Sequence, residues 1–263
     1  METPPPIPSA PAPAVPREPE MSLFARLLNI FAVPGDVFEE VKQSRVRTGN
    51  WLLPLLLTGL MATITGIIIS MQPAIQQQLK EQREKGIEES VKAGKMSRQQ
   101  ADKIEGVFNS MTRPPLLQIV AGLGGIVVGT LKVFGWAFAL WLLGILLLKA
   151  RVSYMKLAEV AGLAAMIGVL GMIVTMLLQV NFSNLASSPS LAMTVKPDPK
   201  SPMFLVLQAL NLFDIWQLCL MAAGLARLAG VPFVRAGFAV FGFWLVMMTG
   251  FITVIAALGR MFG

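Results

Sequence analysis

Two charged residues interrupt long apolar stretches of this sequence, and they are the side chains with which the chain could do chemistry. Lys132 lies within the apolar run 116–148, and Asp214 lies within the run 203–228. An ionised side chain at the centre of a bilayer costs about 2.5–3.5 kcal/mol on insertion scales, so such residues generally have a partner or face a polar space. Counted from the basic ends of the two runs, their depths differ by only about 6 Å at 1.5 Å per residue.

Two interpretations of Lys132 and Asp214 are open. In the first, they form an ion pair that fixes helix packing, or Lys132 extends separately to the membrane surface. In the second, they belong to a polar intramembrane site for a proton or a solute, together with the amides of Gln208 and Asn211. The run 203–228 has no Gly or Pro near Asp214. This argues against the discontinuous helix that marks many transport sites.

Other kinds of catalytic chemistry are poorly represented. The chain has no histidine and one cysteine, Cys219, so imidazole bases, histidine metal sites and an internal disulfide are excluded. Asp214 is the only acid deep within an apolar run, which leaves no pair of carboxylates for acid–base work. The glycines of 122–125 are not followed by the Lys-Ser/Thr of a phosphate-binding loop. The sequence therefore predicts a non-enzymatic protein with no catalytic, cofactor or metal site.

The composition indicates a protein embedded in a lipid bilayer. Hydrophobic residues make up 54% of the 263 residues and charged residues 14%, compared with about 25% charged in soluble domains. The mean hydropathy is +0.64. The net charge is +7, but the basic residues are dispersed and mostly flank apolar runs. That distribution suits anionic lipid headgroups and argues against a nucleic-acid partner.

Five apolar runs are long enough to cross a membrane as helices. The run 51–71 carries no charge and, at 1.5 Å per residue, matches the hydrocarbon thickness of about 30 Å. The other four runs are 117–148, 157–179, 203–228 and 234–258. We therefore predict an all-α membrane protein, with a five-transmembrane-helix bundle over 51–263. At the start of the third span, Glu159 follows Lys156 by three residues, a spacing that predicts an ion pair.

Three segments lie outside these spans. Residues 1–21 form a Pro-rich tail for which we predict disorder. For residues 22–50 we predict amphipathic helices that lie in the membrane interface. For the polar loop 72–115 we predict a helical hairpin with a turn at Gly94. The tail and the loop are the candidate contact sites for protein partners, and nothing in the sequence indicates an oligomeric state. The predicted interfacial anchors are Phe24, Leu27, Leu28, Phe31, Phe38 and Trp51.

Two stretches resemble a known family. The first combines the segment VPGDVFEEVK at 33–42 with the start of the first span, WLLPLLL. The second is NLFDIWQLCLMAAGL at 211–225, with its Trp216 and Gly224. Together they resemble the Yip1-domain family, over roughly residues 22–258. The resemblance implies a five-span membrane protein of the bacterial type. The eukaryotic branch carries an Asp-Leu-Tyr-Gly-Pro motif that this chain lacks, so the small-GTPase partnership of that branch is not expected here.

The distribution of basic residues predicts the orientation. If the N-terminus is cytoplasmic, the inner segments hold Lys42, Arg45, Arg47, Lys149, Arg151, Lys156, Arg227 and Arg235, and the short outer segments hold Lys196, Lys200 and Arg260. The positive-inside rule therefore predicts a cytoplasmic N-terminus and an external C-terminus. The resemblance to the bacterial type of the family implies the cell (inner) membrane of a bacterium.

Two functions are compatible with the sequence. The first is a Yip1-like role in membrane organisation or assembly, through an undefined protein partner. The alternative is a small transporter or channel for an ion, a proton or a lipid, which uses the intramembrane Asp/Lys site. A polar, accessible cavity at Asp214 would favour the alternative.

Overall fold

The computed structural model describes residues 21–111, 113, 115–198 and 201–262. Within these residues the chain forms ten α-helices and one 3-10 helix, and the only β-pairing is an isolated bridge between Ser190 and Asn211. The Pro-rich tail predicted for 1–21 lies outside the described residues, except for Met21. Five helices are long and apolar enough to span a bilayer: α3 (Gly49–Ser70), α6 (Leu116–Leu146), α7 (Tyr154–Phe182), α9 (Leu212–Ala229) and α10 (Phe233–Phe262). The predicted all-α class with five spans is therefore confirmed.

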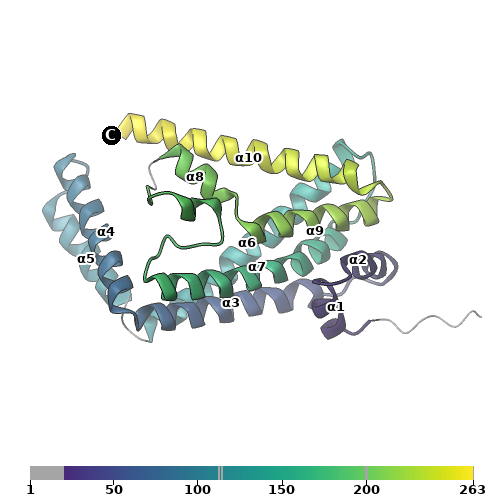
Figure 1. Cartoon of the computed structure of the whole chain (residues 1–263), viewed down its shortest axis with the longest axis horizontal. Helices are drawn as coiled ribbons and strands as arrows, with labels where there is room; N and C mark the ends of the chain where they lie inside the picture. Colours follow the sequence, from purple (N-terminus) through teal and green to yellow (C-terminus); the bar gives the residue numbers. More distant parts are fainter. Residues whose placement is uncertain (1–20, 112, 114, 199–200, 263) are drawn as a thin grey trace, which may run out of the picture.

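Helix α7 is the centre of the bundle and packs against α3, α6 and α9 (Figure 1). Small residues permit these close contacts. A Cβ atom at Gly162 of α7 would lie 2.8 Å from the carbonyl oxygen of Asn50 in α3. A Cβ atom at Gly125 of α6 would lie 2.7 Å from the Cβ of Ala62 in α3. The glycines of α6 and α7 therefore serve helix packing, because small residues allow membrane helices to approach closely.

Helices α1 (Leu23–Asn29) and α2 (Pro34–Gln43) cover one end of the bundle. Ser22 caps α1 by accepting a hydrogen bond from the Ala25 N–H at 3.1 Å. Helix α2 packs against α9 and α7 and buries its apolar face, including Phe38, in the protein core. The N-terminal helices are therefore held by protein contacts as well as by any contact with lipid.

The six predicted anchor residues are divided between the surface and the interior. Phe24 and Leu28 are 70% and 54% exposed. Leu27 and Phe38 are buried in the core, so the structure does not leave them free to anchor the chain in lipid. The other two make aromatic contacts within the protein: Phe31 with Trp216 of α9, and Trp51 with Phe134 of α6. The sequence pattern identified an apolar face correctly but did not indicate that α2 would pack on the bundle.

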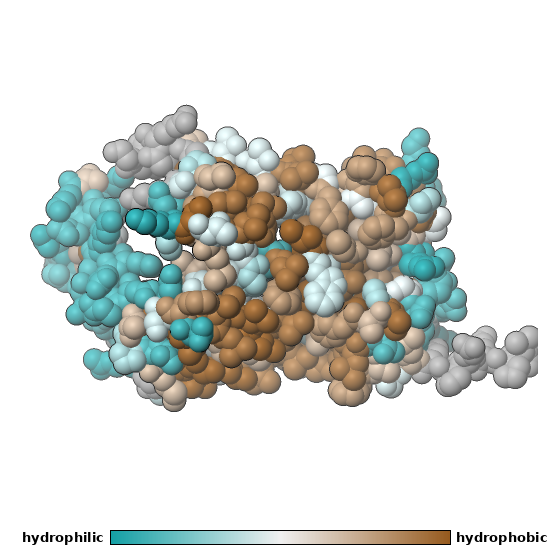
Figure 2. Space-filling view, viewed as in Figure 1, coloured by the Kyte–Doolittle hydropathy of each residue, from teal (hydrophilic) through white to brown (hydrophobic). Residues whose placement is uncertain are grey.

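The opposite end carries α4 (Pro73–Lys92) and α5 (Arg98–Met111), which project beyond the spanning helices (Figure 1). The backbone between them turns at Gly94, whose φ of +68° favours glycine. The guanidinium of Arg83 lies 4.8 Å from the centroid of the Phe108 ring, which connects the two helices. Figure 2 shows this end as hydrophilic, whereas the bundle carries a broad apolar belt. The surface pattern is that of a membrane domain with a polar extension.

The predicted fourth span, 203–228, is not one helix. It consists of α8 (Pro202–Ala209) and α9, separated by Leu210 and Asn211. The side chain of Asn211 caps α9 by accepting a hydrogen bond from the Phe213 N–H at 2.9 Å. The loop after α7 pairs with the backbone at the break, because the Leu212 N–H donates to the Pro189 carbonyl at 3.0 Å. A favourable N-cap residue and these loop contacts stabilise the interruption without Gly or Pro.

Candidate functional site

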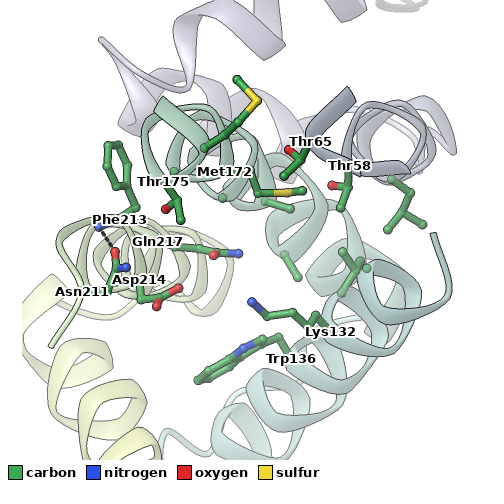
Figure 3. A pocket seen from close by; sticks show the side chains of 18 of the residues that line it. Thr58, Thr65, Lys132, Trp136, Met172, Thr175, Asn211, Phe213, Asp214 and Gln217 are labelled. Atoms are coloured by element: carbon green, nitrogen blue, oxygen red, sulfur yellow. Dashed lines mark hydrogen bonds between the residues drawn. The ribbon is translucent and has the colours of Figure 1, made fainter. Parts of the chain in front are cut away.

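A cavity of about 470 Å³ lies among α3, α6, α7 and α9 (Figure 3). Its volume is within the range of about 300–1,000 Å³ that is usual for small-molecule sites. The wall is mainly apolar, with side chains such as Leu55, Ile69 and Met176. Its polar side chains are Thr58, Thr65, Lys132, Thr175, Gln179, Asn211, Asp214 and Gln217. An apolar space with a few polar groups is the usual composition of a ligand-binding site.

Lys132 contributes the positive charge of the cavity from α6. Figure 3 shows its amino group directed into the space, with Trp136 beside it. Trp136 is one helical turn further along α6, and its ring makes an edge contact with Phe243 of α10 at a centroid distance of 5.8 Å. The aromatic contact with α10 holds the Trp136 ring at the edge of the cavity.

Asp214 contributes the negative charge from α9. It lies in the first turn of that helix, immediately after the Asn211 cap. A carboxylate is favourable at this position because the N-terminus of a helix carries a partial positive charge. A Cβ atom at Gly171 of α7 would lie 2.9 Å from the Cβ of Phe213, so α9 begins in close contact with α7. The break before α9 thus places the carboxylate on the wall of the cavity.

Gln217 completes the polar part of α9, one helical turn after Asp214. It is 9% exposed, and Figure 3 shows its amide directed into the cavity. A Cβ atom at Gly168 of α7 would lie 3.5 Å from the Gln217 side-chain oxygen, so the small residue leaves room for the amide. An amide can both donate and accept hydrogen bonds, so Gln217 suits either end of a polar ligand.

Lys132 and Asp214 face the same space from opposite walls but do not form the predicted ion pair. Neither side chain has a hydrogen-bond or salt-bridge partner within the described part of the chain, and both are exposed to the cavity. Helices α6 and α9 make few contacts with each other, because the cavity lies between them at this level. The arrangement offers separate sites for a negative and a positive group.

The structure brings together three of the four predicted polar residues, Lys132, Asn211 and Asp214. Gln208 is exposed on α8 and does not line the cavity. The prediction placed Gln208 and Asp214 on one continuous helix, and the break at Leu210 changes their relative direction. Gln217 was missed, although its position three residues after Asp214 puts both on one face of α9.

A second group of charges lies at the α1–α2 end, and it is paired. Lys156 and Glu159 of α7 lie 3.5 Å apart, which confirms the ion pair expected from their spacing. Glu159 also accepts a hydrogen bond from the side chain of Asn50, and both residues are fully buried. The Lys156 amino group donates to the carbonyls of Val41 and Ser44 at the end of α2. These contacts connect α2, α3 and α7.

A further ion pair fixes α1 to α2. The buried guanidinium of Arg26 lies 2.7 Å from the Glu40 carboxylate, which also accepts a hydrogen bond from the Met21 N–H. In these two ion pairs, each charge is neutralised by its partner inside the protein. We therefore interpret this region as structural support for the N-terminal helices.

The fold and the site together define an all-α membrane protein with five spanning helices and a polar cavity among them. The Yip1 domain family model matches residues 28–255, nearly the whole chain. The chain therefore belongs to the Yip1 domain family, as its two family-like stretches suggested. Comparison with curated proteins gave no match, and comparison with solved structures gave none either.

Proposed function

We propose that this chain is a non-enzymatic membrane protein that binds a small polar or amphipathic molecule in its cavity and carries it within or across the bilayer. The observation that carries this proposal is the pair of opposite charges exposed in the cavity without neutralising each other. Unpaired charges at this depth are costly, and in membrane proteins they commonly mark ligand or ion pathways.

The discontinuous fourth span supports the same function. Interrupted helices in transporters expose backbone and helix ends to a substrate near the middle of the membrane. Here the interruption at Leu210 and Asn211 ends three residues before Asp214. The lack of Gly or Pro near Asp214 had argued against such an interruption, and so against transport. The break therefore removes the main argument against it.

We infer that the cavity is accessible from one end of the bundle. Its lining extends to Ile69 near the end of α3 and to Gln179 near the end of α7, toward α4 and α5. In the other direction, the lining reaches Ala161 of α7, and the neighbouring Leu163 and Ile167 belong to the core that continues beneath α1 and α2. We infer that the ligand enters from the α4–α5 end.

We further propose that the α1–α2 end is cytoplasmic and that the α4–α5 end faces outward, in the inner membrane of a bacterium. Support comes from the basic residues that flank the spans near α2 and the loops after α6 and α9. With this orientation, the accessible side of the cavity is external.

A role in membrane organisation or assembly is the second candidate, and helix α5 supports it. This helix projects from the bundle and exposes four large apolar side chains, with Val107 60% exposed. The exposed set is Ile104, Val107, Phe108 and Met111. A protein partner could bind this apolar face.

Cysteine accessibility tests the proposed function. In a Cys219→Ser background, Thr175→Cys would place a thiol on the cavity wall, whereas Ala164→Cys would place one on the same helix in the packed core. We expect a charged, membrane-impermeant thiol reagent to label Thr175→Cys in intact membranes and to leave Ala164→Cys unmodified. Labelling of Thr175→Cys no faster than that of Ala164→Cys would contradict an accessible cavity.

A further inference from the structure

We propose that the ligand of the cavity is a zwitterionic phosphodiester of ethanolamine, with its ammonium group at Asp214 and its phosphate at Lys132. The inference rests on the proposed function and names the chemical class that this site would recognise. The two groups that define the class come from different helices, α6 and α9, and face one cavity (Figure 3).

Charge balance is the first reason for a zwitterion. A ligand with a single charge would neutralise one of the two side chains and leave the other without a partner in a mostly apolar space. An uncompensated charge in such surroundings is strongly unfavourable. A zwitterion satisfies both side chains at once and adds no net charge to the membrane interior.

The separation of the two charges is the second reason. Lys132 and Asp214 do not form a salt bridge with each other in the described structure, although they face the same space. A ligand that bridges them must therefore keep its own two charges apart. In a phosphodiester of ethanolamine, two carbon atoms separate the ammonium nitrogen from the phosphate oxygen, which provides such a spacer.

The neighbouring side chains suit the same orientation. Trp136 lies beside Lys132, and its indole N–H can donate a hydrogen bond to a phosphate oxygen. Gln217 lies beside Asp214, and its amide oxygen can accept a hydrogen bond from an ammonium group. Each end of the zwitterion thus meets one charged and one neutral polar group.

Two sources could supply this headgroup chemistry: phosphatidylethanolamine in the bilayer, or a soluble compound such as glycerophosphoethanolamine. Apolar side chains on the cavity wall, including Leu55, Ile69 and Met172, are compatible with the lipid, whose acyl chains must lie against apolar surface. The soluble compound requires only the polar part of the cavity. The experiment therefore includes both.

The test is native mass spectrometry of the full chain, reconstituted with equimolar phosphatidylethanolamine and phosphatidylglycerol and then released into detergent. We expect the wild type to retain phosphatidylethanolamine over phosphatidylglycerol by about tenfold, which corresponds to about 1.4 kcal/mol. Glycerophosphoethanolamine is added as a competitor in a second arm. Displacement of the lipid at equal concentration would assign the site to the soluble zwitterion, and no displacement would assign it to the lipid.

Two variants separate the roles of the charges. Asp214→Asn removes the ammonium partner and should abolish the preference, because Lys132 still attracts both lipid phosphates. Lys132→Met removes the phosphate partner and should lower retention of both lipids by about tenfold without favouring phosphatidylglycerol. The matched controls are Asp102→Asn and Lys85→Met on the exposed helices α5 and α4, and they should behave as the wild type.

Three results would overturn the inference. One is equal retention of the two lipids by the wild type, and another is no retention of either lipid together with no binding of glycerophosphoethanolamine. The third is a preference that survives Asp214→Asn. If Thr175→Cys is labelled while any of these results holds, the accessible cavity stands and only its ligand class is wrong. If Thr175→Cys is not labelled, the proposed function fails as well.

Discussion

The two halves of the bundle differ in whether their charged side chains are paired. At the α1–α2 end, Lys156 contacts Glu159 and the end of α2, and Arg26 contacts Glu40. At the cavity, Lys132 and Asp214 have no partner among the described residues, although they face the same space. Paired charges inside a protein hold elements together, whereas unpaired charges are retained at a cost in stability. We therefore propose structural support as the role of the first half and ligand binding as the role of the second.

The two halves also differ in side-chain packing: the α1–α2 half has a packed core, and the other half contains the cavity. Along α7, Leu157, Leu163 and Ile167 are buried in a continuous core, whereas Gly168, Met172 and Thr175 line the cavity. One helix therefore contributes to both regions, and the two sets of residues overlap along it, because Ala161 and Ala165 also line the cavity. The packed core at the α1–α2 end therefore supports the helix that forms part of the cavity wall.

Removal of Glu159 should have the largest effect on stability. The substitution Glu159→Ala would leave the buried side chain of Asn50 without its acceptor and Lys156 without its counter-charge. We expect a loss of about 3–5 kcal/mol, as when one partner of a buried pair is removed. Thermal or denaturant unfolding in detergent would measure it. Asp214→Ala is the matched control: it removes a charge that has no partner among the described residues, so it should leave stability unchanged or raise it. Equal losses for the two variants would remove the distinction between the halves.

Close packing between α3 and α7 should be the next most sensitive feature. In Gly162→Ala, the new methyl group would meet the backbone of Asn50 and Trp51, which cannot move independently of α3. We expect a loss of about 1–3 kcal/mol, as for overpacked cores. Gly135→Ala on α6 meets no atom within 4 Å and should be neutral or slightly stabilising. Equal unfolding midpoints for the two variants would contradict the close approach of these helices.

The smallest expected effect lies outside the bundle, on α4. A hydrogen bond and the charge of Lys92, 2.8 Å away, hold the pKa of Glu88 below its ordinary value of 4.5. Because the folded pKa is the lower one, the stabilising contribution is present above pH 4.5 and is lost as the pH falls through the folded pKa. NMR titration of the full chain should show this lowered pKa, and Lys92→Met should return it toward 4.5. An unchanged pKa in Lys92→Met would show that Lys92 is not its cause.

Hydropathy was sufficient to predict the five spans and the two intramembrane charges, because both depend on the runs of apolar residues themselves. It did not predict the break before Asp214, which depends on the Asn211 cap and on backbone contacts with the loop near Pro189. Those loop contacts join residues about twenty positions apart, and hydropathy carries no information about them. The same limit explains why Gln208 was included, since its direction depends on where α9 begins. Gln217 lies three residues after Asp214, and that spacing could have identified it.

The N-terminal helices show a related limit. Their amphipathic pattern predicted an apolar face but did not say whether lipid or protein would cover it. In the structure, Phe38 is buried against the bundle, while Phe24 remains exposed. The two outcomes differ because α2 packs against α9 and α7, which is a tertiary contact that periodicity cannot reveal.

The most direct test of the contrast between the halves is a pair of double-mutant cycles, measured by unfolding of the full chain in detergent. The first cycle combines Lys132→Met with Asp214→Leu, and the second combines Lys156→Met with Glu159→Leu. We expect a coupling free energy below about 0.5 kcal/mol for the cavity residues, as for sites without direct interaction, and above about 1 kcal/mol for the paired residues. A coupling above about 1 kcal/mol between Lys132 and Asp214 would show that they form a structural ion pair. That result would contradict the assignment of the cavity to a ligand.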